Sequence, residues 1–292
     1  MAARARRLLL GAHMSIQGGL HRAIERGEKV GCTALQLFTR NNLQWVAPPL
    51  AADAIARFRD AWAASSIGPI VAHANYLINL ASPDRTLRRR SLDGLLLDLR
   101  RAAAMGVPWL ILHPGNHMGA GEEAGLRRVA DLAARALDAI ADLPVGLLLE
   151  NTAGQGTALG HRFEHLAWLL DAIDAPAARL GICLDTCHLH AAGYDLRTPR
   201  AYRRTLRDFD RLIGLSRLHA IHVNDAKGPL GSRLDRHAHI GRGTLGLAAF
   251  RSLLRDRRLR CVPKVIETPK KDERRKDWDN VNLRRLRRLV TR

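Results

Sequence analysis

Residues 221–239 read I-H-V-N-D-A-K-G-P-L-G-S-R-L-D-R-H-A-H, and they anchor the interpretation of the whole chain. The apolar run 218–223 predicts a short strand, and the asparagine, glycines and proline after it predict a loop. His222 is therefore expected at the C-terminal end of a strand. Asp235 and His237 lie two positions apart, so in an extended segment both side chains can face one ion. Taken alone, the stretch fits a solvated polar loop better than a metal site, and the other strand ends change that balance.

Short apolar runs alternate with longer amphipathic segments along the chain, at a spacing of roughly 35 residues. The predicted strands are residues 8–13, 34–38, 69–73, 109–113, 146–150, 181–185, 218–223 and 262–267. The predicted helices are residues 18–26, 51–64, 82–105, 122–140, 162–173, 199–213, 247–255 and 280–290. Eight βα repeats without a linker predict an α/β fold, a single (β/α)8 TIM barrel that forms one domain over residues 1–292.

The charge of the chain favours a polyanionic partner. Its 292 residues include 47 Lys+Arg against 28 Asp+Glu, a formal net charge of +19. Such a balance suits DNA or RNA better than a small neutral substrate. Arginine supplies nearly all of these cations and alanine is abundant, so genome-wide base composition is the competing explanation of the charge.

The cysteines and the apolar runs bear on the cellular compartment. Cys32, Cys183, Cys187 and Cys261 form no CxxC pair and no regular framework, which predicts reduced thiols. No apolar run reaches the roughly 18 residues of a membrane span. Residues 1–10 lack the long apolar region and cleavage site of a signal peptide. We therefore expect a cytoplasmic, unsecreted monomer without an obligate protein partner.

The predicted strands end repeatedly in residue types that bind metals. In a TIM barrel these ends meet at one face, where the active site lies. Burying several carboxylates together is costly unless cations compensate them, which predicts bound metal ions. Imidazole and carboxylate ligands without thiolate suit Zn²⁺, Mn²⁺ or Fe. With the pair in residues 221–239, the candidate ligands are His73, His113, Glu150, Asp185, His188, His222, Asp235, His237 and Glu267.

These nine candidates are too many for one ion. With a bridging carboxylate they fit three ions of about three ligands each, which leaves open positions for water and substrate. Such ions polarise a phosphoryl group and lower the pKa of bound water toward neutrality.

Several motifs in their order along the chain resemble the endonuclease IV family. They are G-A-H-M-S-I-Q-G-G (11–19), L-Q-L-F-T-R-N (35–41), H-A-N-Y-L-I-N-L-A (73–81), L-H-P-G (112–115), L-E-N-T-A-G-Q-G (149–156), L-D-T-C-H-L-H-A-A-G-Y-D (184–195), H-V-N-D-A-K (222–227), G-S-R-L-D-R-H (231–237) and I-E-T-P-K (266–270). Members of this family are apurinic/apyrimidinic (AP) endonucleases of DNA base excision repair, built on a xylose-isomerase-like TIM barrel. The resemblance covers nearly the whole chain.

The resemblance implies three zinc ions. His73, His113 and Glu150 would hold the first. Glu150 would bridge to a second ion held by Asp185, His222 and Glu267, which makes Glu150 and Glu267 the expected catalytic carboxylates. A third ion would be held by the remaining ligands, His188, Asp235 and His237.

The resemblance also implies residues that contact duplex DNA. Tyr76 matches a family tyrosine on a DNA-binding loop. Some members insert an arginine into the DNA stack near the lesion, and Leu43 stands at that position here, which leaves the inserting residue open. Loop cations expected to contact phosphates, with solvated surface as the alternative, are Arg40, Lys227, Arg233, Arg236 and Arg242.

The implied reaction is hydrolysis of the phosphodiester 5′ to an abasic site, which leaves a 3′-hydroxyl and a 5′-deoxyribose phosphate. One alternative is a sugar isomerase or epimerase on the same barrel, which typically needs only one or two metals. The set His188, Asp235 and His237 and the charge of +19 argue against it. The other alternative is a non-catalytic nucleic-acid-binding protein, against which the complete ligand set argues.

Overall fold

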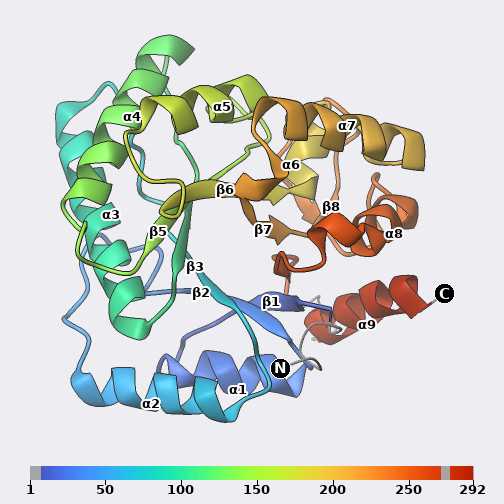
Figure 1. Ribbon diagram of the computed structural model, residues 1–292, viewed down its shortest axis with the longest axis horizontal. Helices are drawn as coiled ribbons and strands as arrows, with labels where there is room; N and C mark the ends of the chain where they lie inside the picture. The colour runs from blue at the N-terminus through green and yellow to red at the C-terminus, as the bar shows by residue number, and fades with distance from the viewer. Residues whose placement is uncertain (1–7, 271–276, 292) are drawn as a thin grey trace.

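The computed structural model describes residues 8–270 and 277–291. Its parallel strands close into a barrel in the order β1-β10-β7-β6-β5-β4-β3-β2, and helices surround it (Figure 1). The barrel strands are β1 (Leu10–Met14), β2 (Ala34–Phe38), β3 (Ile70–His73), β4 (Trp109–Leu112), β5 (Gly146–Glu150), β6 (Leu180–Asp185), β7 (Leu218–His222) and β10 (Lys264–Ile266). The predicted TIM barrel is confirmed. Most of the segment considered as a signal peptide, residues 1–7, lies outside the described residues.

All the predicted helices are present, with ends displaced by a few residues. They are α1 (His21–Lys29), α2 (Ala52–Ala64), α3 (Arg85–Met105), α4 (Glu122–Asp138), α5 (Phe163–Ala172), α7 (Pro199–Leu212), α8 (Leu247–Arg255) and α9 (Trp278–Thr291). Helix α3 begins later than predicted because Asp84 caps it, accepting the N–H of Leu87 at 2.9 Å. None of the helices in the described part of the chain is both long and apolar enough to span a bilayer.

Two local features depart from the predicted pattern. Helix α6 (Thr186–Ala191) follows β6 directly, because the Asp185 side chain accepts the N–H of His188 and caps a new helix at the strand end. The predicted loop after β7 contains a small antiparallel hairpin of β8 (Asp225–Ala226) and β9 (His237–Ala238). Both features fix residues beside the predicted metal ligands.

Every second side chain of each strand points into the barrel, so the interior side chains form layers. A buried apolar cluster fills its middle, formed by Val71, Ile111, Leu148, Cys183 and Ala220. Each of these residues stands two positions before a predicted ligand, so both side chains of each pair point into the barrel. The apolar cluster therefore forms a close-packed floor beneath the candidate site.

Below this cluster the Trp109 ring stacks on His219, with ring centroids 4.4 Å apart and planes 18° from parallel. Glycines on neighbouring strands leave the space for this stack. A Cβ added at Gly146 would lie 2.4 Å from the Trp109 ring, and one added at Gly181 would lie 2.4 Å from the His219 ring. The barrel is thus closed at its end opposite the candidate site.

We predict that Gly146→Ala destabilises the fold by about 1–3 kcal/mol, because the added methyl group overpacks the Trp109 ring. The same change at Gly94 inside α3 is the matched control, since a Cβ there meets its nearest neighbours at 3.5 Å. That substitution should be neutral or stabilising by up to about 1 kcal/mol through helix propensity. Urea denaturation of both variants measures the difference, and equal stability would contradict the packing argument.

Candidate metal centre

The nine predicted ligands gather at the C-terminal mouth of the barrel. Strands β3, β5, β6 and β7 end in His73, Glu150, Asp185 and His222. The others directly follow a strand or lie in the short elements after β6 and β7: His113, His188, Asp235, His237 and Glu267. Parallel strands place all these ends at one face, so the barrel itself assembles the centre.

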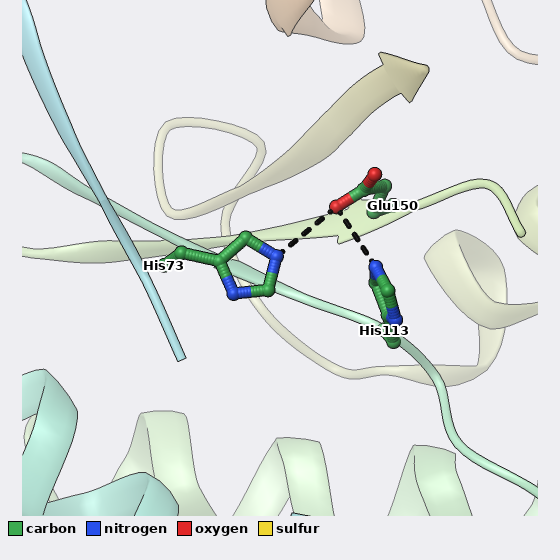
Figure 2. Close-up of side chains that lie close together, drawn as sticks. All are labelled: His73, His113 and Glu150. Atoms are coloured by element: carbon green, nitrogen blue, oxygen red, sulfur yellow. Dashed lines mark hydrogen bonds and ion pairs between the residues drawn. The ribbon is translucent and has the colours of Figure 1, made fainter. Parts of the chain in front are cut away.

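The first ligand set is His73, His113 and Glu150 (Figure 2). Glu150 Oε2 lies 3.3 Å from His73 Nε2 and 3.2 Å from His113 Nε2. His73 Nδ1 donates to the carbonyl of Ala74 at 2.8 Å, which leaves the lone pair on Nε2 directed at the carboxylate. The set is therefore oriented to hold an ion between two imidazoles and one carboxylate.

The second set shares Glu150 and adds Asp185, His222 and Glu267. His222 Nδ1 lies 2.9 Å from Glu150 Oε1, 3.1 Å from Glu267 Oε2 and 3.8 Å from Asp185 Oδ2. Three carboxylates thus converge on one imidazole nitrogen, and the two oxygens of Glu150 face different ligand sets. This arrangement supports the predicted bridging position of Glu150.

The third set is built from α6 and the β8–β9 hairpin. Asp235 Oδ1 lies 3.2 Å from His188 Nε2 and 3.7 Å from His237 Nε2. Asp185 Oδ2 also lies 3.7 Å from His237 Nε2, so it stands between the second and third sets. His237 Nε2 is buried without a hydrogen-bond partner among the described residues, as expected of a nitrogen that ligates an ion. The residues therefore fit a bound metal in this set as well.

The pKa values of these buried groups are shifted in the directions that favour positive charge beside the carboxylates. Burial of Glu150 would raise its pKa, yet the neighbouring imidazoles of His222, His113 and His188 together hold that pKa well below its ordinary value. The same opposition lowers the pKa of Glu267 well below its usual range. Burial lowers the pKa of His188, but Asp185, Asp235 and Glu150 together outweigh it and raise the pKa well above the usual value. Protons on the imidazoles thus balance the negative charge of the carboxylates. Bound metal ions would displace these protons and balance the same charge.

Residues outside the predicted ligand set hold the ligands in place. Gln36 Oε1 accepts from His222 Nε2 at 2.7 Å, so the lone pair of His222 lies on Nδ1, which faces the carboxylates. Gln36 Nε2 also donates to Glu267 at 2.6 Å. Asn224 donates to Asp185 Oδ2 at 2.6 Å and accepts the Glu267 N–H at 2.7 Å. Neither residue was among the predicted site residues, although a glutamine inside the apolar strand A-L-Q-L-F was a usable signal.

The predicted lesion-contacting side chains are exposed at this same face. Leu43 is 72% exposed in the loop after β2, and Tyr76 is 55% exposed in the loop after β3. The Tyr76 ring meets His73 edge-on at a centroid distance of 5.5 Å, so it stands directly beside the first ligand set. Between the first and third sets opens a cleft of about 220 Å³, lined by His113 and Asp235 among others.

The predicted phosphate contacts fall into two groups. Lys227, Arg233 and Arg236 are exposed around the β8–β9 hairpin. Arg242 is exposed as well, and its guanidinium lies over the Trp278 ring at 4.7 Å from the centroid. Arg40 differs from these four because the structure buries it.

Arg40 has its guanidinium engaged inside the protein. Its Nε lies 2.8 Å from Asp98 Oδ1 and its Nη2 lies 3.1 Å from Asp98 Oδ2. Asp98 also accepts the N–H of Asn75 at 3.1 Å, and the Asn75 amide donates to the carbonyls of Asn41 and Gln44. Arg40 therefore fixes the loops after β2 and β3 against α3, and a direct phosphate contact is not its role in this arrangement.

A TIM barrel with interlocking sets of imidazole and carboxylate ligands at its C-terminal mouth defines a metal-dependent barrel enzyme. The family model described as xylose isomerase-like TIM barrel matches residues 24–289. Relatives narrow this class further.

A protein described as probable endonuclease 4 from Geobacter sulfurreducens is 48% identical over 283 residues, which are 97% of this chain and 95% of the relative. A relative of the same description from Chloroflexus aurantiacus is 49% identical over 280 residues, covering 96% and 97% of the two chains. The crystal structure of endonuclease IV from Thermus thermophilus matches with a TM-score of 0.84 at 37% identity, covering 97% of this chain and 98% of that chain.

The chain belongs to the endonuclease IV family. The predicted family and enzyme class, a metal-dependent endonuclease, are therefore confirmed. The sugar isomerase and the non-catalytic nucleic-acid-binding protein are less well supported.

We predict that Gln36→Met weakens binding of the ion in the second ligand set by about 10–100-fold, because His222 loses the acceptor that fixes its tautomer. Methionine keeps the side-chain length, so packing in the barrel should change little. Titration with a chromogenic chelator measures the affinity. Gln17→Met, at an exposed position, is the control, and an unchanged affinity at Gln36 would exclude this positioning role.

Proposed function

We propose that the chain is an AP endonuclease that cuts duplex DNA 5′ to an abasic nucleotide, with three zinc-type ions held by the nine ligands. Mn²⁺ or Fe are candidates for some positions. The observation that carries the proposal is the position of Glu150, whose two oxygens face separate ligand sets 3.2 Å from His113 and 2.9 Å from His222. A carboxylate so placed can bridge two ions at the distance that in-line displacement at phosphorus requires.

Each ligand set has a distinct part in this reaction. Bound ions would supply hydroxide at neutral pH and neutralise charge on the departing oxygen. Glu150 and Glu267 would help to hold the ions that activate the attacking water. His188, Asp235 and His237 would hold the ion that neutralises the departing 3′ oxygen, with Asp235 lining the cleft. Because Asp235 and His237 in the third set are distinct from the ligands of the first set, ions in the two sets could stabilise attack and departure at the same time.

Recognition of the lesion is assigned to exposed apolar side chains. Most of the large exposed hydrophobic residues in the described ranges lie in loops at the mouth of the barrel, namely Leu43, Val46, Tyr76, Met118 and Leu234. An abasic nucleotide lacks a base that stacks or pairs, so its extrusion costs less than that of an intact nucleotide. Leu43 and Tyr76 would fill the gap left in the stack, while the narrow cleft beside His113 would exclude an intact base.

The proposed partner is double-stranded DNA that contains abasic sites. The charge of +19 favours binding to phosphates without regard to sequence. Arg236 lines the cleft, Lys227 and Arg233 are exposed in the same β8–β9 region, and all three would position the duplex. We further propose a single-domain monomer that acts on the chromosome in the cytoplasm.

A duplex with one synthetic abasic site tests the function. The protein should cut 5′ to the site, leave an end that a polymerase extends, and lose this activity to a chelator. Glu150→Gln should reduce cleavage by at least roughly a hundredfold, the range for losing a group that stabilises charge in the transition state. It should keep its circular dichroism spectrum, because the apolar floor below the site is unchanged.

Glu123→Gln is the matched control for this change, since Glu123 lies on the surface in an ion pair with Arg127. Its cleavage rate should equal that of the unaltered protein. Near-normal turnover by Glu150→Gln would overturn the bridging role, and cleavage that persists after complete metal removal would overturn the proposed chemistry.

We predict that Leu43→Ala and Tyr76→Ala each weaken binding to abasic duplex by roughly tenfold or more, since stacking against bases contributes about 1–3 kcal/mol per residue. Binding to undamaged duplex should barely change, because phosphate contacts dominate it. Fluorescence anisotropy with both duplexes separates the two effects. Val290→Ala, at an exposed position in α9, is the control. Equal losses on damaged and undamaged DNA would show that these residues only shape their loops.

A further inference from the structure

A second cluster of metal-binding side chains lies outside the centre at the barrel mouth. One ligand atom each from Glu122, His161 and His165 lies within 4.8 Å of the others. Glu122 begins α4, His161 ends the loop after β5, and His165 lies in the first turn of α5. The two imidazoles are largely buried, with side chains 11% and 3% exposed. None of these residues belongs to the nine ligands described above.

The distances in this cluster match those between ligands of one ion. Glu122 Oε2 lies 3.3 Å from His165 Nε2, and Glu122 Oε1 lies 3.7 Å from His161 Nε2. Ligands of a tetrahedral zinc ion with bonds of about 2.1 Å stand about 3.4 Å apart. The cluster therefore needs no movement of its backbone to accept such an ion.

Hydrogen bonds direct a lone pair of His161 into the cluster. His161 Nδ1 donates to the carbonyl of Ala158 at 3.0 Å, so its Nε2 carries no proton in the neutral ring. This nitrogen faces the Glu122 carboxylate, which also only accepts. Two acceptors facing one another call for a cation between them.

Arg162 places a cation on the other side of the cluster, between Glu122 and His165. Its Nη2 lies 3.1 Å from Glu122 Oε2 and 2.8 Å from His165 Nε2, and its Nε donates to the same His165 nitrogen at 3.1 Å. Burial, together with Arg162, lowers the pKa of His165 to about 4, so the imidazole is neutral at physiological pH. The Arg162 side chain is 54% exposed and can turn into solvent. With Nε2 as the acceptor, from Arg162 or toward an ion, the proton of neutral His165 lies on Nδ1, so the Gly160 N–H at 3.3 Å from Nδ1 is a contact that metal binding leaves unchanged.

We propose that Glu122, His161 and His165 form a further binding site for a zinc-type divalent ion, which displaces the Arg162 guanidinium. Two imidazoles and a carboxylate suit zinc, and water would complete the tetrahedron. The histidines share one short segment, H-R-F-E-H, and the glutamate comes from a different βα unit. The ion would therefore fasten α4 to the beginning of α5.

The loop that precedes His161 connects this further site to the mouth of the barrel. Leu159 N–H donates to the carbonyl of Gly115 at 2.8 Å, and Gln155 Oε1 accepts the N–H of Asp235 at 2.9 Å. Asp235 belongs to the third ligand set. The ion at this further site thus has a structural role, in which it steadies the loop that supports a ligand of the main centre.

Metal counting on the full chain tests the proposal. Metal-free protein is equilibrated with Zn²⁺, desalted and measured by mass spectrometry. His161→Gln should hold one ion fewer per chain than the unaltered protein. Arg162→Ala should bind that ion at least roughly tenfold more tightly, since a competing cation is removed. His21→Gln, outside every candidate cluster among the described residues, should change neither value.

Two results would overturn the proposal. One is an equal metal content in His161→Gln and the unaltered protein. The other is an Arg162→Ala variant that is less stable and binds no more zinc, which would make the cluster an ion-pair network only. His188→Ala removes a ligand of the mouth instead, and adding His161→Gln to this variant should lower its metal content by one further ion per chain. The difference caused by His161→Gln therefore tests this site whatever number of ions the mouth holds.

Discussion

The structure depends on one buried carboxylate that has only histidines as ionic partners among the described residues. Glu150 is fully buried, and its oxygens lie within 3.3 Å of His73, His113, His188 and His222. No lysine or arginine in the described ranges compensates it. An isolated carboxylate in such surroundings would be strongly unfavourable. The imidazoles can carry protons or bind metal ions together with the carboxylate. The negative charge of Glu150 is therefore balanced by protons or metal ions, which can exchange, and not by a fixed lysine or arginine charge.

The barrel makes this arrangement possible through the alternation of its strands. On five neighbouring strands the residue two positions before a ligand is apolar and joins the floor of the site. The inward face of each of these strands thus supplies first an apolar side chain to the floor and then, two positions later, a candidate ligand to the site. Because the floor is close-packed down to the Trp109–His219 stack, the ligands rest on a base that resists displacement. Ligand positions are therefore set by the fold before any ion binds.

Much of the fold and of the ligand set could be predicted because their signals are local. A strand shows as an apolar run, and a ligand shows as a histidine or carboxylate at its end. The role of Gln36 could not be predicted, since its partner His222 is 186 positions away and meets it only through the closure of the barrel. Arg40 was expected to contact phosphate because of its place in a loop, but it forms a buried ion pair with Asp98, 58 positions away. Helix α6 was missed because Asp185 acts as a helix cap and as a ligand candidate at once.

The Asp98 network also bears on how a strongly basic protein with the proposed function would distinguish a lesion from intact DNA. Phosphate contacts bind any duplex, so the charge of +19 gives no preference for damage. A preference must come from groups that meet the gap in the stack, and these bind better when they are held in place beforehand. Asp98 receives hydrogen bonds from both the Leu43 loop and the Tyr76 loop, through Arg40 and Asn75. Under the proposed function, the buried ion pair would serve recognition indirectly, because it fixes the two loops that carry Leu43 and Tyr76, the side chains proposed to enter the gap at an abasic site.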